Sequence, residues 1–527
     1  MPKIYIYDTT LRDGSQGEGI SFTVADMIKI ATRLDEAGFD YIEGGWPGSN
    51  PKHEEFFERM KSIPLSHAKL AAFGSTRRAR VRAEEDHNLI KLVAADTPVV
   101  TIFGKSWDLH VTDALRIELE QNVELIYDSV QFLKSHGKEV IYDAEHFFDG
   151  YKANPEYAIK TLKAAAAGGA DSIVLCETNG GAMPSEVIDV LNVVREAVDV
   201  PIGMHAHNDS GLAVANSIIA VQHGCTQVQG TINGYGERCG NANLMAIIPN
   251  LQIKLGYDCI PDASLRELTA LSVYVDETAN IVPNDRQPYV GRSAFAHKAG
   301  IHVDAMMKNK ETYEHINPEL VGNERRILIS ELAGTGSVAH KAEKLGLDLT
   351  KQSPETREVL ARVTELENKG YSFEGAEASF ELLVQKAVGS YRKLFDFKSF
   401  RVIVEQRGTD PQPITEATLR VVADGEEMLT VAEGDGPVHA LDSALRKALE
   451  KFYPEELAHI KLTDYKVRVL NASEGTAAGV RAIVESSDGT TTWSTVGVST
   501  NIIEASWYAL VDSVEYGLLK LMRSQQA

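Results

Sequence analysis

The strongest constraint on the fold is a regular alternation of short apolar runs and helical patterns over the first 255 or so residues. Helical patterns such as residues 26–37 and 116–135 separate the runs, and several end in glycine, which favours helix termination. Eight strand–helix units predict an α/β fold, a closed (β/α)₈ barrel, with an open doubly wound sheet as the alternative. No Gly-x-Gly-x-x-Gly follows the first run, which argues against a dinucleotide-binding sheet. The eight runs are residues 4–7, 41–44, 70–73, 99–103, 140–142, 173–175, 202–204 and 228–232.

The rest of the chain has two different patterns. Residues 259–397 are mostly helical, and we expect a helical linker there, after a barrel over residues 1–258. From residue 398 short strands predominate and an internal repeat appears. Residues 417–452 and 479–522 each read as strand, Asp-Gly turn, strand and helix. This predicts an α+β domain over residues 398–527, whose lack of a metal or nucleophile set favours binding or dimerisation over catalysis.

The charge of the chain excludes several classes of function. Lys and Arg number 53 and Asp and Glu number 75, so the net charge is −22. Such a surface repels nucleic-acid phosphates and anionic lipids, so we expect neither a nucleic-acid nor a membrane partner. No window approaches the roughly 18 apolar residues of a membrane-spanning helix. Four cysteines without a Cys-x-x-Cys pair, and an N-terminus without a signal-like apolar stretch, predict a cytoplasmic protein with reduced thiols.

Polar residues follow several of the predicted strands, where barrel enzymes carry their catalytic groups. His205 and His207 are two residues apart at a strand end, so both imidazoles point to one face and can reach one ion. Arg12 and Asp13 follow the first run, where an ion pair that caps a turn is the alternative interpretation. Asp13, the two histidines and Asn241 together offer oxygen and nitrogen ligands without a thiolate. Such a set suits Mg²⁺, Mn²⁺ or a labile Zn²⁺ and leaves positions open for a 2-oxo acid.

A further polar cluster lies outside the predicted barrel. Residues 295–304 contain His302 and Asp304, and Tyr313 follows. The cluster can be a polar helix face, or it can be a general base in which Asp304 orients His302.

Four motifs in combination resemble the 2-isopropylmalate, homocitrate and citramalate synthases. They are Asp-Thr-Thr-Leu-Arg-Asp-Gly at 8–14, His-x-His-Asn-Asp at 205–209, Gly-x-Gly-Glu-Arg-x-Gly-Asn at 234–241 and His-Lys-x-Gly-Ile-His at 297–302. The first motif alone also occurs in lyases such as 3-hydroxy-3-methylglutaryl-CoA lyase, but the combination is specific and covers nearly the whole chain. Within the family, the sequences at 14–19 and 44–51 depart from the usual isopropylmalate pattern and resemble the citramalate synthase subgroup, whose 2-oxo acid is pyruvate.

The resemblance implies an acyltransferase of isoleucine biosynthesis that condenses acetyl-CoA with pyruvate and water to give (R)-citramalate and CoA. Pyruvate chelates a divalent metal (Mn²⁺, Mg²⁺ or Zn²⁺), an arginine donates to its keto oxygen, and a base takes a proton from the methyl of acetyl-CoA. The residues that the resemblance assigns are Asp13, His205, His207 and Asn241 for the metal, Arg12 and Thr178 for substrate binding, and Arg12, Glu145, His302, Asp304 and Tyr313 for catalysis.

The resemblance also implies a homodimer, in which the segment around His302 completes the partner's active site, and a C-terminal regulatory domain that binds isoleucine as feedback effector. Three rival functions remain open. A 2-isopropylmalate synthase differs only in the size of its substrate pocket. A carbon–carbon lyase is disfavoured by the repeated C-terminal domain. A non-catalytic amino-acid sensor would be expected to lose the metal ligands, yet all of them are present.

Overall fold

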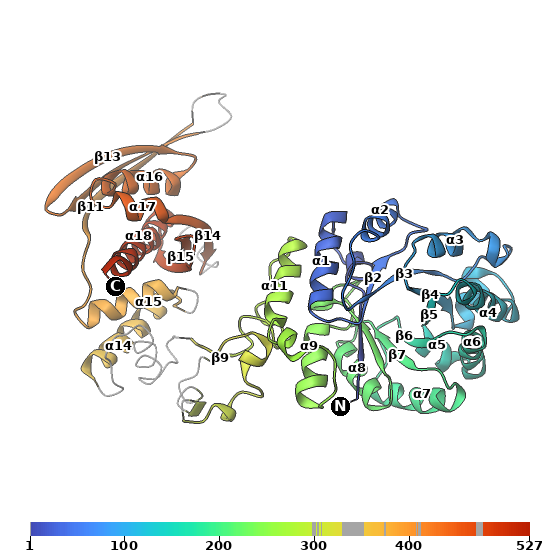
Figure 1. The fold of residues 1–527 in the computed structure, drawn as a ribbon. Helices are drawn as coiled ribbons and strands as arrows, with labels where there is room; N and C mark the ends of the chain where they lie inside the picture. The colour runs from blue at the N-terminus through green and yellow to red at the C-terminus, as the bar shows by residue number, and fades with distance from the viewer. Residues whose placement is uncertain are drawn as a thin grey trace. The chain divides into compact units, whose positions relative to one another are not determined.

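The computed structural model describes residues 2–297, 302, 305–306, 308–328, 353–373, 376–406, 408, 413–470 and 478–526. The chain divides into two compact units (Figure 1). The first contains Met1–Phe295 and Ile316–Glu324, and the second contains Ala296–His315 and Arg325–Ala527. In the described ranges, no helix is both long and apolar enough to span a bilayer.

The first unit is a closed barrel of eight parallel strands, which confirms the predicted fold. Neighbours along the chain pair with one another, and β1 also pairs with β8, with Tyr5 opposite Gln227 and Asp8 opposite Gly230. This closure leaves the barrel without a free strand edge. The eight strands are β1 (Tyr5–Asp8), β2 (Tyr41–Gly45), β3 (Lys69–Ser75), β4 (Val99–Lys105), β5 (Glu139–Glu145), β6 (Ser172–Glu177), β7 (Ile202–Ala206) and β8 (Gln227–Gly230).

Helices follow the strands and cover the outside of the barrel (Figure 1). Their starts have clear local causes: at α1, the Thr23 hydroxyl accepts from the Asp26 amide, and the Asp26 carboxylate accepts from the Thr23 amide. These helices are α1 (Val24–Glu36), α2 (Pro51–Met60), α3 (His87–Ala94), α4 (Leu119–Ser135), α5 (Phe147–Ala153), α6 (Pro155–Gly168), α7 (Pro184–Ala197) and α8 (Ala213–Gln222), followed by α9 (Leu244–Pro249), α10 (Asp262–Leu265) and α11 (Leu268–Thr278).

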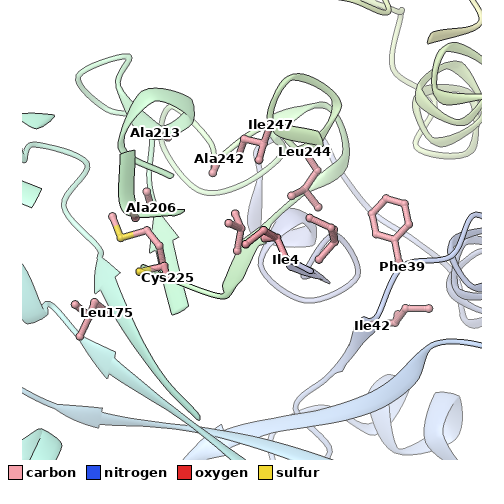
Figure 2. Close-up of a cluster of buried hydrophobic side chains, with 14 of the residues drawn as sticks. Ile4, Phe39, Ile42, Leu175, Ala206, Ala213, Cys225, Ala242, Leu244 and Ile247 are labelled. Atoms are coloured by element: carbon pink, nitrogen blue, oxygen red, sulfur yellow. The ribbon is translucent and has the colours of Figure 1, made fainter. Parts of the chain in front are cut away.

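The apolar core of the barrel has an outer and an inner layer. The outer layer lies between strands and helices, and Figure 2 shows Ile4 and Ile42 in this cluster with Leu244 and Ile247 of α9. Each such buried side chain contributes about 1.5–3 kcal/mol of transfer free energy. The inner cluster consists of Tyr7, Tyr41, Ala71, Val99, Ile141, Val174 and Cys176. Because strand side chains alternate between faces, residues two positions further along these strands also face inward, toward the barrel mouth.

The second unit confirms the internal repeat. It contains two antiparallel three-stranded sheets, each followed by a helix, and each copy begins with a strand that the sequence analysis did not include. These added strands, β11 and β14, are edge strands rich in charged residues, so their apolar pattern is weak. The predicted boundaries at 258 and 397 stay predictions. The elements are β9 (Ala296–His297), β10 (Arg326–Ile327), α14 (Pro354–Asn368), α15 (Glu377–Ala387), β11 (Phe395–Glu405), β12 (Ile414–Ala423), β13 (Glu426–Gly434), α16 (Pro437–Leu449), α17 (Pro454–His459), β14 (Lys461–Val469), β15 (Val480–Ser487), β16 (Thr492–Ser499) and α18 (Ile502–Gln526).

We predict that Gly497→Ala destabilises the second unit. A Cβ atom at Gly497 in β16 would lie 2.0 Å from the carbonyl oxygen of Ala505 and 2.8 Å from the amide nitrogen of Ala509, both in α18. Backbone atoms cannot swing aside as a side chain does, so the helix must move off the sheet, at a cost of about 1–3 kcal/mol. The denaturation midpoint, followed by tryptophan fluorescence, should fall. Gly436→Ser is the control, because a Cβ there meets nothing within 4 Å and serine is a favourable helix N-cap. An equal shift in both variants would contradict the prediction.

Candidate active site

The carboxyl ends of the strands surround a cavity of about 260 Å³. This volume is below the range of about 300–1,000 Å³ that is usual for drug-sized ligands, so the cavity suits a small substrate and the reactive end of a larger one. Every strand of the barrel, or the loop after it, contributes to the lining. The lining residues are Arg12, Asp13, Gln16, Trp46, Phe73, Phe103, Asp143, Glu145, Cys176, Thr178, His205, His207, Glu237 and Arg238.

Three predicted metal ligands meet in this cavity. Asp13, His205 and His207 are all buried, and their ligand atoms lie within 4.8 Å of one another. The Asp13 Oδ2 atom is 3.3 Å from His205 Nε2 and 3.9 Å from His207 Nε2. The period of two along β7 brings the two histidines together, as predicted, with their Nε2 atoms 3.3 Å apart.

The fourth predicted ligand, Asn241, lies beside His207, with which it forms a β-bridge. Its amide group donates to the Tyr235 carbonyl at 3.2 Å, whereas its buried Oδ1 atom has no hydrogen-bond partner in the described part of the chain. A buried oxygen without a partner costs about 1–3 kcal/mol. Carboxylate, amide oxygen and two imidazoles form a donor set that fits a hard or borderline divalent cation.

The electrostatics of the cavity keep these groups in the forms that bind metals. Burial raises the pKa of Asp13, but Arg12 and the two imidazoles more than offset this, so its pKa lies below the ordinary value. Burial, and then repulsion from His205, lower the pKa of His207 to about 3. Burial also raises the pKa of Cys176, so its thiol stays neutral. An ionised carboxylate and neutral imidazoles are the ligand forms that a metal requires.

Arg12 is clamped beside the metal ligands. Its Nε atom donates to Glu43 Oε1 at 2.5 Å, its guanidinium carbon lies 3.7 Å from the centre of the Phe73 ring, and Nη1 is 3.5 Å from Asp13 Oδ2. Glu43 is fully buried and also accepts from the hydroxyls of Tyr7 and Thr9, both at 2.6 Å. The guanidinium is therefore fixed with one edge bound and the other toward the cavity. Glu43 was missed by the sequence analysis, although a carboxylate inside an apolar strand is a recognisable signal.

Thr178 and Glu145 also line the cavity, at the ends of β6 and β5. The Thr178 hydroxyl accepts a hydrogen bond from the His146 amide at 2.9 Å, which leaves its own proton free to be donated. Glu145 forms a charge-assisted hydrogen bond with Lys105, a residue that the sequence analysis did not single out.

The remaining predicted catalytic residues belong to the second unit. The rings of His302 and Tyr313 stack with their centroids 4.2 Å apart. Asp304 lies outside the described residues. Because the two units are defined separately, the assignment of His302, Asp304 and Tyr313 to the barrel cavity stays a prediction.

Comparisons with known proteins account for the whole chain. The HMGL-like family matches residues 3–275, the homocitrate synthase post-HMGL domain-like family matches 289–371, and the LeuA allosteric (dimerisation) domain matches 374–518. An (R)-citramalate synthase of Geobacter sulfurreducens is 58% identical over 99% of this chain and 98% of its own length. One from Aquifex aeolicus is 55% identical over 98% of each chain. The chain belongs to the (R)-citramalate synthase family. A 2-isopropylmalate synthase of Methanocaldococcus jannaschii is 32% identical over 98% of this chain and 95% of its own.

Three aromatic rings form one wall of the cavity in this family member. Phe73 and Phe103 stack with centroids 5.5 Å apart, and Trp46 meets both edge-on at 6.0 and 5.7 Å. The indole nitrogen of Trp46 donates to the Asn88 side chain at 2.6 Å, which fixes the ring. The wall is rigid because each ring supports the others. Trp46 stands in one of the subgroup stretches, but its contact with the other two rings was not predictable from the sequence.

We predict that His207→Ala loses bound metal, whereas Arg12→Ala keeps it. On this assignment the imidazole of His207 is a metal ligand, whereas Arg12 is expected to act on charge that forms only in the transition state. The loss of Arg12 should therefore lower the rate on the order of 100-fold or more. Elemental analysis and steady-state rates measure the two effects. Because Arg12→Ala leaves Glu43 charged and buried, a double variant with Glu43→Gln controls for instability. An unchanged metal stoichiometry in His207→Ala would refute the ligand assignment.

Proposed function

We propose that this chain condenses acetyl-CoA with pyruvate and water to give (R)-citramalate, CoA and a proton. The observation that carries the proposal is the full-length identity of 49–58% with five (R)-citramalate synthases, together with a cavity that contains Asp13, His205 and His207. An acyltransferase with this activity takes part in isoleucine biosynthesis. A non-catalytic sensor has no reason to keep three buried metal-binding side chains in contact, and the 2-isopropylmalate synthases among the relatives are only 32–34% identical.

In this proposal Asp13, His205, His207 and Asn241 hold a divalent cation, with Mn²⁺, Mg²⁺ and Zn²⁺ as the candidates. When bound, the ion polarises the keto group of pyruvate as a Lewis acid. Arg12 donates to the keto oxygen and stabilises the negative charge that develops there as the new carbon–carbon bond forms. Its salt bridge with Glu43 orients the guanidinium beforehand, so no reorganisation is needed during the reaction.

The Thr178 hydroxyl donates to the carboxylate of pyruvate, since its oxygen already accepts from the His146 amide. A base then removes a proton from the methyl group of acetyl-CoA, and we assign this step to His302 with Asp304. The enolate carbon adds to the keto carbon, and hydrolysis of the thioester releases CoA. Tyr313, which stacks on His302, and Glu145, which is paired with Lys105, serve in proton transfer or in positioning the hydrolytic water.

The aromatic wall supports pyruvate as the 2-oxo acid. Pyruvate carries a methyl group beside its keto carbon, whereas 2-oxoisovalerate carries an isopropyl group. Phe73 packs against both Arg12 and Phe103, and this packing resists the displacement that a larger substituent would require.

We therefore predict at least about a tenfold preference in kcat/KM for pyruvate over 2-oxoisovalerate, because a packed pocket separates substrates by roughly 1–3 kcal/mol per methylene. CoA release from acetyl-CoA measures the preference. Phe103→Leu should reduce this preference, because a smaller side chain in the aromatic wall leaves more room in the pocket. Phe132→Leu in α4 is the control, since Phe132 is partly buried against the apolar core and does not line this cavity. Equal or better turnover of 2-oxoisovalerate by the natural chain would favour a 2-isopropylmalate synthase.

The second unit carries the proposed regulation. Its match to the LeuA allosteric (dimerisation) domain supports an oligomer, which we propose to be a homodimer, and isoleucine as its feedback effector. The barrel of one subunit would then receive the His302 segment of the other. We also propose a cytoplasmic location, in keeping with four free cysteines, of which three are buried.

We predict that the full chain binds isoleucine and that a chain ending at Glu324, which keeps all residues of the first unit, does not. An effector must bind one state of the enzyme better than another, and a coupling of about 1–3 kcal/mol changes activity roughly 5- to 150-fold. Calorimetry gives the binding, and leucine is the matched control ligand. Retained Mn²⁺ binding and a thermal transition establish that the shortened chain is folded. Isoleucine binding of equal strength by both chains would assign the effector site to the barrel.

A further inference from the structure

The two histidines of the cavity differ in the hydrogen bonding of their Nδ1 atoms. His205 Nδ1 lies 2.9 Å from Oε1 of Gln229, a fully buried residue of β8. Gln229 Nε2 in turn donates to Asp143 Oδ1 at 3.0 Å. His207 Nδ1, by contrast, has no hydrogen-bond partner within the described ranges. A chain of three side chains from β5, β8 and β7 therefore supports only His205.

This series of hydrogen bonds from Asp143 through Gln229 to His205 determines which nitrogen of His205 carries the proton. The NH₂ group of Gln229 donates to Asp143 Oδ1, so the amide oxygen of Gln229 faces His205. An amide oxygen can only accept, so Nδ1 of His205 must be the protonated nitrogen. A neutral imidazole has a single N–H, and Nε2 therefore presents its lone pair to Asp13 Oδ2, 3.3 Å away.

We propose that Gln229 is a positioning residue that holds His205 in the tautomer and ring orientation needed to bind the cation. The inference rests on the divalent-cation site of the proposed function, and it assigns Asp143 as the group that orients Gln229. Partners behind a metal-binding histidine typically change metal affinity by 10- to 100-fold when they are replaced.

A neutral amide suits this position better than the carboxylate that often stands behind a metal-bound histidine. The carboxyl groups of Asp13, Glu43 and Asp143 already lie near Arg12, which is their partner or neighbouring cation. A further carboxylate at position 229 would add repulsion in a region from which water is largely excluded. Asp143 orients the amide group of Gln229, and that amide in turn orients the His205 ring without adding a charge.

The test is the affinity for Mn²⁺ alone, measured by calorimetry without substrates. Gln229→Met keeps the length of the side chain but cannot accept from His205, and we expect affinity to fall 10- to 100-fold. Gln227→Met is the matched control: Gln227 is also buried, two residues earlier on the same inner face of β8. The Mn²⁺ affinity of Gln227→Met should equal that of the natural chain. Asp143→Asn should cause a smaller loss, because an asparagine side chain allows either orientation of the Gln229 amide.

Four results would overturn the inference. Unchanged Mn²⁺ affinity in Gln229→Met contradicts it, and so does an equal loss in both methionine variants, which would indicate packing alone. Absence of Mn²⁺ binding by the natural chain would contradict the proposed metal site as well, whereas citramalate formation tests the proposed function separately. If Gln229→Met does not fold, nitrogen-15 NMR spectra of the natural chain show which ring nitrogen of His205 is protonated. The signals of His205 are identified by their loss in His205→Gln. A proton on His205 Nδ1 is expected, and one on Nε2 overturns the proposal.

Discussion

The close approach of three buried side chains of metal-binding types at the mouth of the barrel is the constraint on which the rest of the site depends. Asp13 Oδ2 lies 3.3 Å from His205 Nε2 and 3.9 Å from His207 Nε2, and the two Nε2 atoms are 3.3 Å apart. Burial removes the water that would screen them. The proposed divalent cation would bind between these side chains, and the surrounding polar groups would support it. Gln229 hydrogen-bonds His205 Nδ1, and Arg12 lies 3.5 Å from Asp13 and balances part of its negative charge.

Most of the fold could be predicted from the sequence, because each strand of the barrel is a short apolar run between helical patterns. The repeat in the second unit was also recognisable from its two Asp-Gly turns, which lie between β12 and β13 and between β15 and β16. The first strand of each copy was not. Edge strands expose most of their side chains, as β11 does, and so lose the alternation that marks a half-buried strand.

The candidate site could be predicted only in part. The spacing of His205 and His207 reveals that they share a face, and Asp13 follows a recognisable strand. Gln229 gave no such signal, since a glutamine near a strand end is usually an ordinary polar residue. Its role depends on contacts with Asp143 of β5 and His205 of β7, which only the fold brings together. The contact of Phe103 with two other rings likewise depends on three strands that are separate in the sequence.

The position of the predicted ligands would also link a bound cation to closure of the barrel. Asp13 follows β1, His205 lies in β7, and Asn241 follows β8, so the predicted ligands span the seam where the first and last strands pair. An ion that binds only the assembled strands stabilises them by RT ln(1 + [ion]/Kd), about 2.7 kcal/mol when the free ion is at 100 times its Kd. In the unfolded chain these ligands are far apart, and nothing comparable binds. The ion proposed to polarise the substrate would therefore also stabilise the contact between the two ends of the barrel sequence.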